Sequence, residues 1–263
     1  MKAAEYINQL LSFEEYSFST EEITKNTKIP ESTVLKELNR LQKKGEIVCL
    51  RKGFYLILPP RYRNLGKLPL QLYVDKLFKF LGRDYYVALF SAAQLHGAAH
   101  QRIQQDYIIT TPPSLRDISS AKCKIRFFKT NEILFSNIVE LKSDAGRFNV
   151  SSPALTAIDL IHYQNKIGGL NRIMPIFEEL IEAISLLDLQ QLLKTYSNTS
   201  SVQRLGYLME LCSADKSFTD LIYDILANQN FFPVLLCPVK GEKAGAVQNR
   251  WKVSVNKEIE TDL

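Results

Sequence analysis

The sequence has few of the residues from which metal and disulfide sites are built. Its 263 residues include four cysteines and three histidines. The cysteines stand far apart, with no C-x-x-C pair and no histidine at ligand spacing, which argues against a zinc site and a disulfide framework. We therefore expect no cofactor and no bound metal, and four reduced, mostly buried thiols: Cys49, Cys123, Cys212 and Cys237.

Long apolar runs are also missing. No stretch approaches the roughly 20 uncharged apolar residues that cross a bilayer. The first residues, Met1 to Glu5, lack the basic start and apolar run of a secretory leader. The sequence therefore predicts a cytoplasmic protein with no membrane partner.

No set of catalytic residues stands out. Lys240 to Gly245 lacks the spacing of a phosphate-binding loop, and no Gly-Ser followed by paired aspartates, the nucleotidyltransferase signature, is present. Asp106 and Glu132 are too isolated to suggest a metal-dependent nuclease. His96 follows a helical pattern, where a structural role is expected. The other two histidines are His100 and His162, and none of the three has an evident catalytic nucleophile beside it. We therefore expect a non-enzymatic protein.

The positive charge is concentrated at the N-terminal end. The whole chain has a net charge of +5 and is 46% hydrophobic, an ordinary globular composition. Residues 1–70 carry 12 Lys and Arg against eight Glu and no Asp, whereas the remaining residues carry 21 basic against 20 acidic side chains. A small basic segment is biased toward polyanions.

The first sixty residues show the pattern of a winged helix-turn-helix. A capping box, Ser19 with Glu22, predicts the start of a second helix. Gly45 ends the third helix, and two β-rich runs joined by Arg51-Lys52-Gly53 predict a hairpin, the wing. The expected elements are helices over 4–11, 20–27 and 31–44, an extended piece over 16–18, and strands over 46–50 and 54–58.

The remainder predicts a mixed α/β domain with a helical segment over 170–229. Arg61 to Leu70 is typical of a linker. The predicted fold class is therefore α+β, with a winged helix-turn-helix domain over 1–66 and a mixed α/β domain over 67–263. Further helices are expected over 72–81, 88–95 and 153–163, and strands over 107–111, 124–129, 137–142, 147–150, 231–239 and 251–255.

The third predicted helix separates apolar from polar positions. Its apolar side is expected to pack on Ile23, Ile47 and Tyr55, and consists of Val34, Leu35, Leu38 and Leu41. A polar helix face of this kind fits the DNA major groove, and the hairpin tip fits the minor groove or backbone. The candidate DNA-binding residues are Ser32, Thr33, Lys36, Asn39, Arg40, Lys43, Arg51 and Lys52.

Two readings of this face remain open beside DNA binding. A polar helix face can be solvated surface, and winged helices also bind proteins. Glu31 and Glu37 would repel phosphate, so only part of the helix can face DNA. One such domain makes few phosphate contacts and would bind DNA weakly at physiological salt. We therefore expect the partner to be double-stranded DNA with operator inverted repeats, bound by a dimer.

Four stretches of the sequence resemble the AbiEi family, the antitoxins and transcriptional regulators of AbiE-type (type IV) toxin–antitoxin systems. The N-terminal stretch has Leu38, Leu41 and Gly45 in its third helix and Lys-Gly-Phe-Tyr in its wing. The others are YYVALFSAAQLHGA over 85–98, VSSPALTAIDL over 150–160 and the tail over 251–258.

The resemblance implies a transcriptional autorepressor that is also an antitoxin. Such a protein represses its own operon at operator inverted repeats and counters a neighbouring nucleotidyltransferase-like toxin, with or without a stable complex. The alternative is a winged-helix regulator whose C-terminal domain binds a small effector or retains enzymatic activity. A pocket around His96, His100 and Asp106 would favour that alternative.

Overall fold

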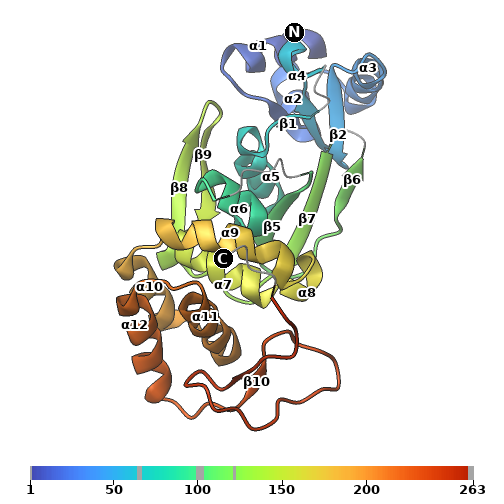
Figure 1. Cartoon of the computed structure of the whole chain (residues 1–263). Helices are drawn as coiled ribbons and strands as arrows, with labels where there is room; N and C mark the ends of the chain where they lie inside the picture. The colour runs from blue at the N-terminus through green and yellow to red at the C-terminus, as the bar shows by residue number, and fades with distance from the viewer. Residues whose placement is uncertain (1, 64–66, 99–103, 121–122, 260–263) are drawn as a thin grey trace. The chain divides into compact units, whose positions relative to one another are not determined.

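The computed structural model describes residues 2–63, 67–98, 104–120 and 123–259 (Figure 1). The structure is a mixture of helices and sheets, as the predicted α+β class requires. It divides into two compact units, one with residues 1–86, 104–133 and 140–149, the other with 87–103, 134–139 and 150–263. This division differs from the predicted boundary after residue 66, and residues 64–66 themselves lie outside the described part of the chain.

The N-terminal segment of the first unit, residues 2–58, has the predicted order of elements. Ser19 begins the second helix as expected, because its Oγ accepts from the Glu22 amide and the Glu22 carboxylate accepts from the Ser19 amide. The elements are α1 (Ala3–Ser12), β1 (Ser17–Ser19), α2 (Thr20–Thr27), α3 (Glu31–Lys43), β2 (Ile47–Arg51) and β3 (Phe54–Ile57).

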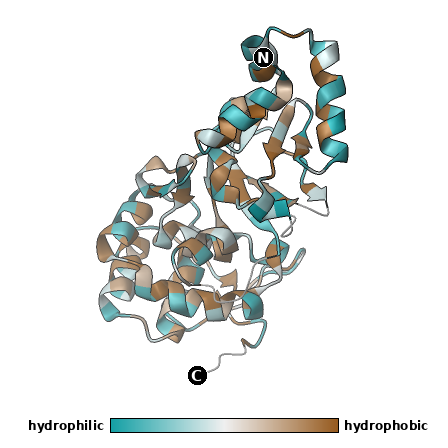
Figure 2. Ribbon diagram, turned by 90° about the horizontal axis from the view of Figure 1, so that it is seen from above, coloured by the Kyte–Doolittle hydropathy of each residue, from teal (hydrophilic) through white to brown (hydrophobic). Residues whose placement is uncertain are grey.

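One hydrophobic core holds this segment together. The three strands form an antiparallel sheet in the order β1-β3-β2. One face of the sheet packs on the three helices, with Phe18, Ile23, Leu38 and Ile47 fully buried in the shared core. The alternating polarity that the helices need for this packing is visible along their ribbons in Figure 2.

A second sheet contributes residues from all six of its strands to the first unit. Its order is β6-β7-β5-β4-β9-β8, with β5 and β7 parallel and β6 and β7 antiparallel. Helix α5 lies within the same unit, and its Phe80 packs 5.2 Å from Phe54 of β3, centroid to centroid. The elements are α5 (Val74–Leu81), β4 (Tyr85–Val87), β5 (Asp106–Thr110), β6 (Ile118–Ser120), β7 (Cys123–Lys129), β8 (Ile138–Ser143) and β9 (Gly146–Ser151).

The predicted linker, Arg61 to Leu70, is partly helical. Its described residues include α4 (Pro60–Arg63) and the start of the 3-10 helix η1 (Leu70–Leu72). The short strand β6 has no counterpart among the predicted elements.

The second unit is mostly helical. Ser152 and Pro153 begin α7 as predicted, because the Ser152 hydroxyl accepts from the Leu155 amide at 3.3 Å. The predicted C-terminal strands are reduced to a short parallel pair, β10 and β11. The elements are α6 (Leu89–Leu95), η2 (Phe135–Asn137), α7 (Pro153–His162), α8 (Gln164–Ile167), α9 (Leu170–Ala183), α10 (Leu186–Thr195), α11 (Thr199–Leu211), α12 (Lys216–Ala227), β10 (Val234–Leu235) and β11 (Val253–Ser254).

Within the described ranges, no helix has the length and apolar character that crossing a membrane would require.

Candidate nucleic-acid interface

Helix α3 buries one side and exposes the other. Val34, Leu38 and Leu41 lie in the core with Ile23, as predicted. Leu35 does not, because 39% of it is exposed. Neighbouring residues of a helix are about 100° apart around its axis, so Leu35 turns away from the buried side on which Val34 lies.

The opposite side of α3 is polar and cationic. The structure brings together all six residues predicted for this surface, and each is exposed. No ion pair joins its three cations to any carboxylate in the described ranges. We call this surface the α3 polar face: Ser32, Thr33, Lys36, Asn39, Arg40 and Lys43.

The two glutamates of α3 are placed away from the middle of this face. Glu37 is half-buried, and its Oε2 accepts from the Ala3 amide at 3.0 Å, at the start of α1. A carboxylate at a helix N-terminus is favoured by the helix dipole. Glu31 lies in the first turn of α3 itself, for which the same argument holds. Glu37 therefore stabilises the junction of α1 and α3, a role that no short-range sequence pattern indicated.

The hairpin between β2 and β3 is short. Its turn consists of Lys52 and Gly53, and Gly53 has a φ of +83°, which favours glycine. Lys52 is exposed at this turn, as predicted. Cys49, expected among mostly buried thiols, is exposed on β2, whereas Cys123 and Cys237 are buried.

Arg51 lies elsewhere than at the predicted tip. It is the last residue of β2, half-buried, with its guanidinium carbon 5.0 Å from the centre of the Phe127 ring on β7. Its Nη2 donates to the Arg116 carbonyl at 2.7 Å. Burial lowers the pKa of Arg51, and nearby Arg83 lowers it further. The side chain is thus engaged within the first unit, through contacts with residues more than sixty positions away in the sequence.

The residues named for an enzymatic alternative have structural partners. His96 Nε2 donates to the Ser151 carbonyl at 2.7 Å, and burial lowers the pKa of His96. Asp106 forms an ion pair with Lys67 at 2.8 Å. His96 and Asp106 belong to different units, and His100 lies outside the described residues. Across the described ranges, no group of three or more His, Cys, Asp or Glu side chains is arranged to hold a metal ion.

A search of solved structures finds chains with a similar fold. The crystal structure of the RV2827C protein from Mycobacterium tuberculosis is similar over 95% of this chain and 90% of that one, with a TM-score of 0.64 and 16% identity. At that identity the likeness shows the fold alone. A nucleotidyltransferase-like protein from Paracoccidioides brasiliensis, described as antigenic, covers 54% of this chain and 89% of its own at 10% identity. Its TM-score of 0.34 is too low to carry an argument.

The family comparison concerns the middle of the chain. No curated protein sequence matches. The model of the AbiEi antitoxin C-terminal domain matches residues 86–211, from strand β4 to the end of helix α11. This range contains two of the stretches on which the sequence resemblance rests, those near 85–98 and 150–160. Residues 86–211 therefore match an AbiEi antitoxin C-terminal domain, and the family resemblance predicted from the sequence is confirmed over this range.

Proposed function

We propose that this protein is a DNA-binding transcriptional autorepressor and the antitoxin of a type IV toxin–antitoxin system. In this proposal the N-terminal segment is a winged helix-turn-helix, with α3 as its recognition helix and the β2–β3 hairpin as its wing. The observation that carries the DNA-binding half is the α3 polar face, whose cations are exposed and unpaired with carboxylates in the described residues.

The order of side chains along α3 suits a helix lying in the major groove. Ser32 and Thr33, in its first turn, are placed to meet base edges. Lys36 and Arg40 can donate to guanine O6 and N7, Arg40 through two parallel bonds. Lys43, in the last turn, would meet phosphate, because backbone contacts lie on either side of the groove. Asn39 lies among them on the same face.

The two predicted wing residues take different roles in this proposal. Lys52, exposed at the turn, would reach the DNA backbone. Arg51 is bound to Phe127 and the Arg116 carbonyl, so we assign it to holding the hairpin in place. Arg51 is therefore not among the DNA contacts that we propose.

The antitoxin half follows from residues 86–211, which match the AbiEi antitoxin C-terminal domain. We propose that this part counters a nucleotidyltransferase-like toxin encoded beside it. The alternative is a regulator whose C-terminal domain binds a small effector or retains enzymatic activity. We favour the antitoxin because two of the residues named for that alternative, His96 and Asp106, are engaged by structural partners.

Two copies of the chain are proposed to bind one operator. A single α3 polar face offers three cations, and affinity from so few phosphate contacts is lost steeply as salt rises. Inverted half-sites would double the contacts. Analytical ultracentrifugation with an operator duplex should therefore give two chains per duplex, and a tight complex with one chain would contradict this part of the proposal.

Operator binding tests the DNA-binding half. The probe is duplex DNA from immediately upstream of the coding sequence, measured by fluorescence anisotropy with the full chain. Lys36→Ala and Arg40→Ala should each weaken binding by about 1–3 kcal/mol if they read bases. Lys194→Ala, an exposed lysine of α10 in the other unit, is the charge-matched control and should bind as wild type does. Wild-type affinity in both α3 variants would remove them from the interface.

Co-expression with the neighbouring gene tests the antitoxin half. Lys36→Glu/Arg40→Glu in the full chain should derepress the promoter and still restore growth against the toxin. Substitutions are preferred to deleting residues 1–66, because deletion would expose the α5 residues that pack on β3. If growth is not restored even by the wild-type chain, the antitoxin assignment fails.

A further inference from the structure

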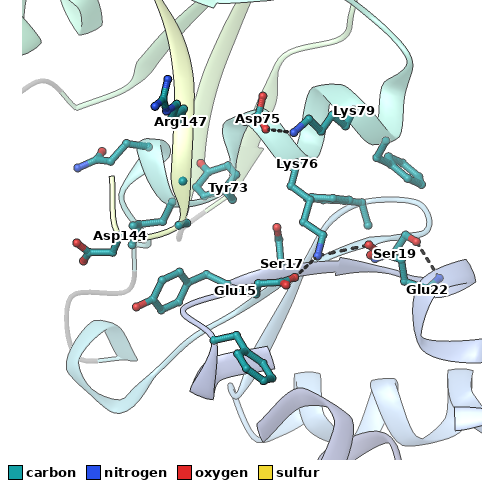
Figure 3. Close-up of a pocket in the computed structure, with 18 of the residues that line it drawn as sticks. Glu15, Ser17, Ser19, Glu22, Tyr73, Asp75, Lys76, Lys79, Asp144 and Arg147 are labelled. Carbon is teal, nitrogen blue, oxygen red and sulfur yellow. Dashed lines mark hydrogen bonds and ion pairs between the residues drawn. The ribbon is translucent and has the colours of Figure 1, made fainter. Parts of the chain in front are cut away.

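A pocket in the first unit is assigned no role by the proposed function. It has a volume of about 810 Å³, within the range of sites for small organic ligands. Strand β1 and the first turn of α2 line one side, and η1 and α5 line another (Figure 3). The turn between β8 and β9 and the start of β9 complete the lining, from Asp144 to Arg147. We call it the β1–α5 pocket.

Ser17 contributes a buried hydroxyl to the lining of this pocket. Side chains alternate along a strand. Phe18 enters the core of the N-terminal segment, whereas Ser17 and Ser19 line the pocket. Ser17 is 1% exposed, and its buried Oγ has no hydrogen-bond partner among the described residues. A buried hydroxyl without a partner is unfavourable, so a polar group that enters the pocket and reaches this oxygen would be stabilised.

The charges of the pocket favour a cation. Its lining has three basic side chains, Lys76, Lys79 and Arg147, and a larger number of carboxylates. This acidic excess stands out in a chain whose net charge is +5. The five carboxylates are Glu15, Glu21, Glu22, Asp75 and Asp144.

The basic side chains of α5 are already occupied by carboxylates of the same pocket. Lys76 Nζ reaches from α5 to Glu15, 2.6 Å away, and to Glu22, 3.4 Å away (Figure 3). Lys79 pairs with Asp75 at 2.7 Å. These lysines are therefore poorly placed to bind an anion. Glu21 forms no ion pair with any described cation, so its charge is available to a ligand.

Aromatic side chains supply an apolar surface beside these charges. Phe13 is 69% exposed and Phe80 is 41% exposed, and both line the pocket. Large apolar side chains with this exposure gain free energy when a ligand covers them, and aromatic faces also attract cations.

We propose that the β1–α5 pocket binds a small organic cation, an ammonium or guanidinium group attached to an aromatic or aliphatic body. The cationic group is held by the Glu21 carboxylate and donates to the Ser17 hydroxyl, and the apolar body covers Phe13 and Phe80. This site is independent of whether α3 binds DNA.

The test titrates the full-length protein with three probes of matched shape. These are 2-phenylethylamine, neutral 2-phenylethanol and anionic 3-phenylpropionate, measured by isothermal titration calorimetry or ligand-observed NMR at low salt. The amine should bind about tenfold more tightly than either of the other two, a difference that one well-placed charge supplies. Equal binding of the three probes, or no binding of the amine at millimolar concentration, would overturn the proposal.

Variants locate the binding to this pocket. Ser17→Ala should weaken amine binding about fivefold, since one hydrogen bond is lost. Glu21→Gln, at an exposed position that carries little risk to folding, should weaken it about threefold. Glu132→Gln removes the same charge from an exposed position of the first unit outside the pocket and should leave binding unchanged. Wild-type binding by both pocket variants would contradict the site.

Discussion

Arg51 was a candidate DNA contact in the sequence, but its side chain has a structural role in the first unit. In the sequence it is one of two basic residues beside a hairpin glycine. In the structure its guanidinium stacks on Phe127 and donates to the Arg116 carbonyl. Both contacts come from a part of the chain that no local pattern connects with the hairpin. Lys52, the next residue, is exposed and makes neither contact.

Substitution separates these two neighbours. Arg51→Ala should lower the free energy of unfolding by about 1–2 kcal/mol, because a cation–π contact and a hydrogen bond are lost. Lys52→Ala should change it by less than about 0.5 kcal/mol, as exposed positions usually do. Urea denaturation followed by circular dichroism measures both. Equal stability of the two variants would show that the Arg51 contacts contribute nothing to the fold.

His96 makes the stability of the second unit depend on pH. A carbonyl can only accept, so the His96 Nε2 that bonds to Ser151 carries the proton, and burial lowers the pKa of this histidine. The folded-state pKa therefore lies below the unfolded value. Between the two values the unfolded state binds more protons, so stability is present at neutral pH and is lost as pH falls.

We expect His96→Gln to weaken this dependence. Glutamine can still donate to Ser151 but does not titrate near neutral pH. The wild-type free energy of unfolding should fall between pH 7 and pH 5, by at most about 1.4 kcal/mol per pH unit for one group. The variant should lose less over the same interval. His162, whose pKa burial also lowers, is present in both proteins and cancels in the comparison. Parallel pH profiles would contradict the assignment.

At the scale of elements, the packing of the C-terminal tail on one helix of the second unit requires a glycine in that helix. Gly206 lies in α11, and the Trp251 ring lies where a Cβ at this position would be. Trp251 is itself 1% exposed, and its indole N–H donates to Glu210. Gly206 thus allows the C-terminal tail to lie directly on the helix backbone.

Gly206→Ala should therefore destabilise the protein although alanine favours helices. Inserting a methyl group into a packed core costs about 1–3 kcal/mol, which exceeds the gain of about 1 kcal/mol from helix propensity. Thermal unfolding, followed by Trp251 fluorescence, measures the loss. Gly245→Ala, where a Cβ would meet nothing within 4 Å, is the control. A variant at 206 as stable as that control would show that the tail does not pack there.

The elements that could be predicted from the sequence are those with local signals. The capping pairs Ser19 with Glu22 and Ser152 with Pro153 place helix starts correctly. Strand β6 was missed because Ile118-Ser119-Ser120 has neither length nor alternation, and its existence depends on pairing with β7. The role of Glu37 and the opposite roles of Arg51 and Lys52 likewise depend on contacts distant in sequence, which periodicity does not encode.

At the scale of the whole molecule, the predicted module and the compact units do not coincide. The N-terminal segment has its own core, and the apolar positions that form this core follow the helix and strand periodicity that the sequence shows. Its sheet also packs on α5 through Phe54 and Phe80, and Lys76 of α5 pairs with Glu15 and Glu22. The proposed DNA-binding segment is therefore part of a larger unit, so its function is best tested in the full chain.

The salt dependence of operator affinity tests the central proposal, that the α3 polar face meets DNA. The logarithm of the binding constant should fall linearly with the logarithm of salt concentration, by about 0.9 for each phosphate neutralised. For each bound chain, Lys43→Ala should reduce this slope by about 1, as expected of a phosphate contact, and Lys194→Ala should not change it. A Lys43→Ala line that coincides with wild type, together with wild-type affinity in Lys36→Ala and Arg40→Ala, would contradict the proposal.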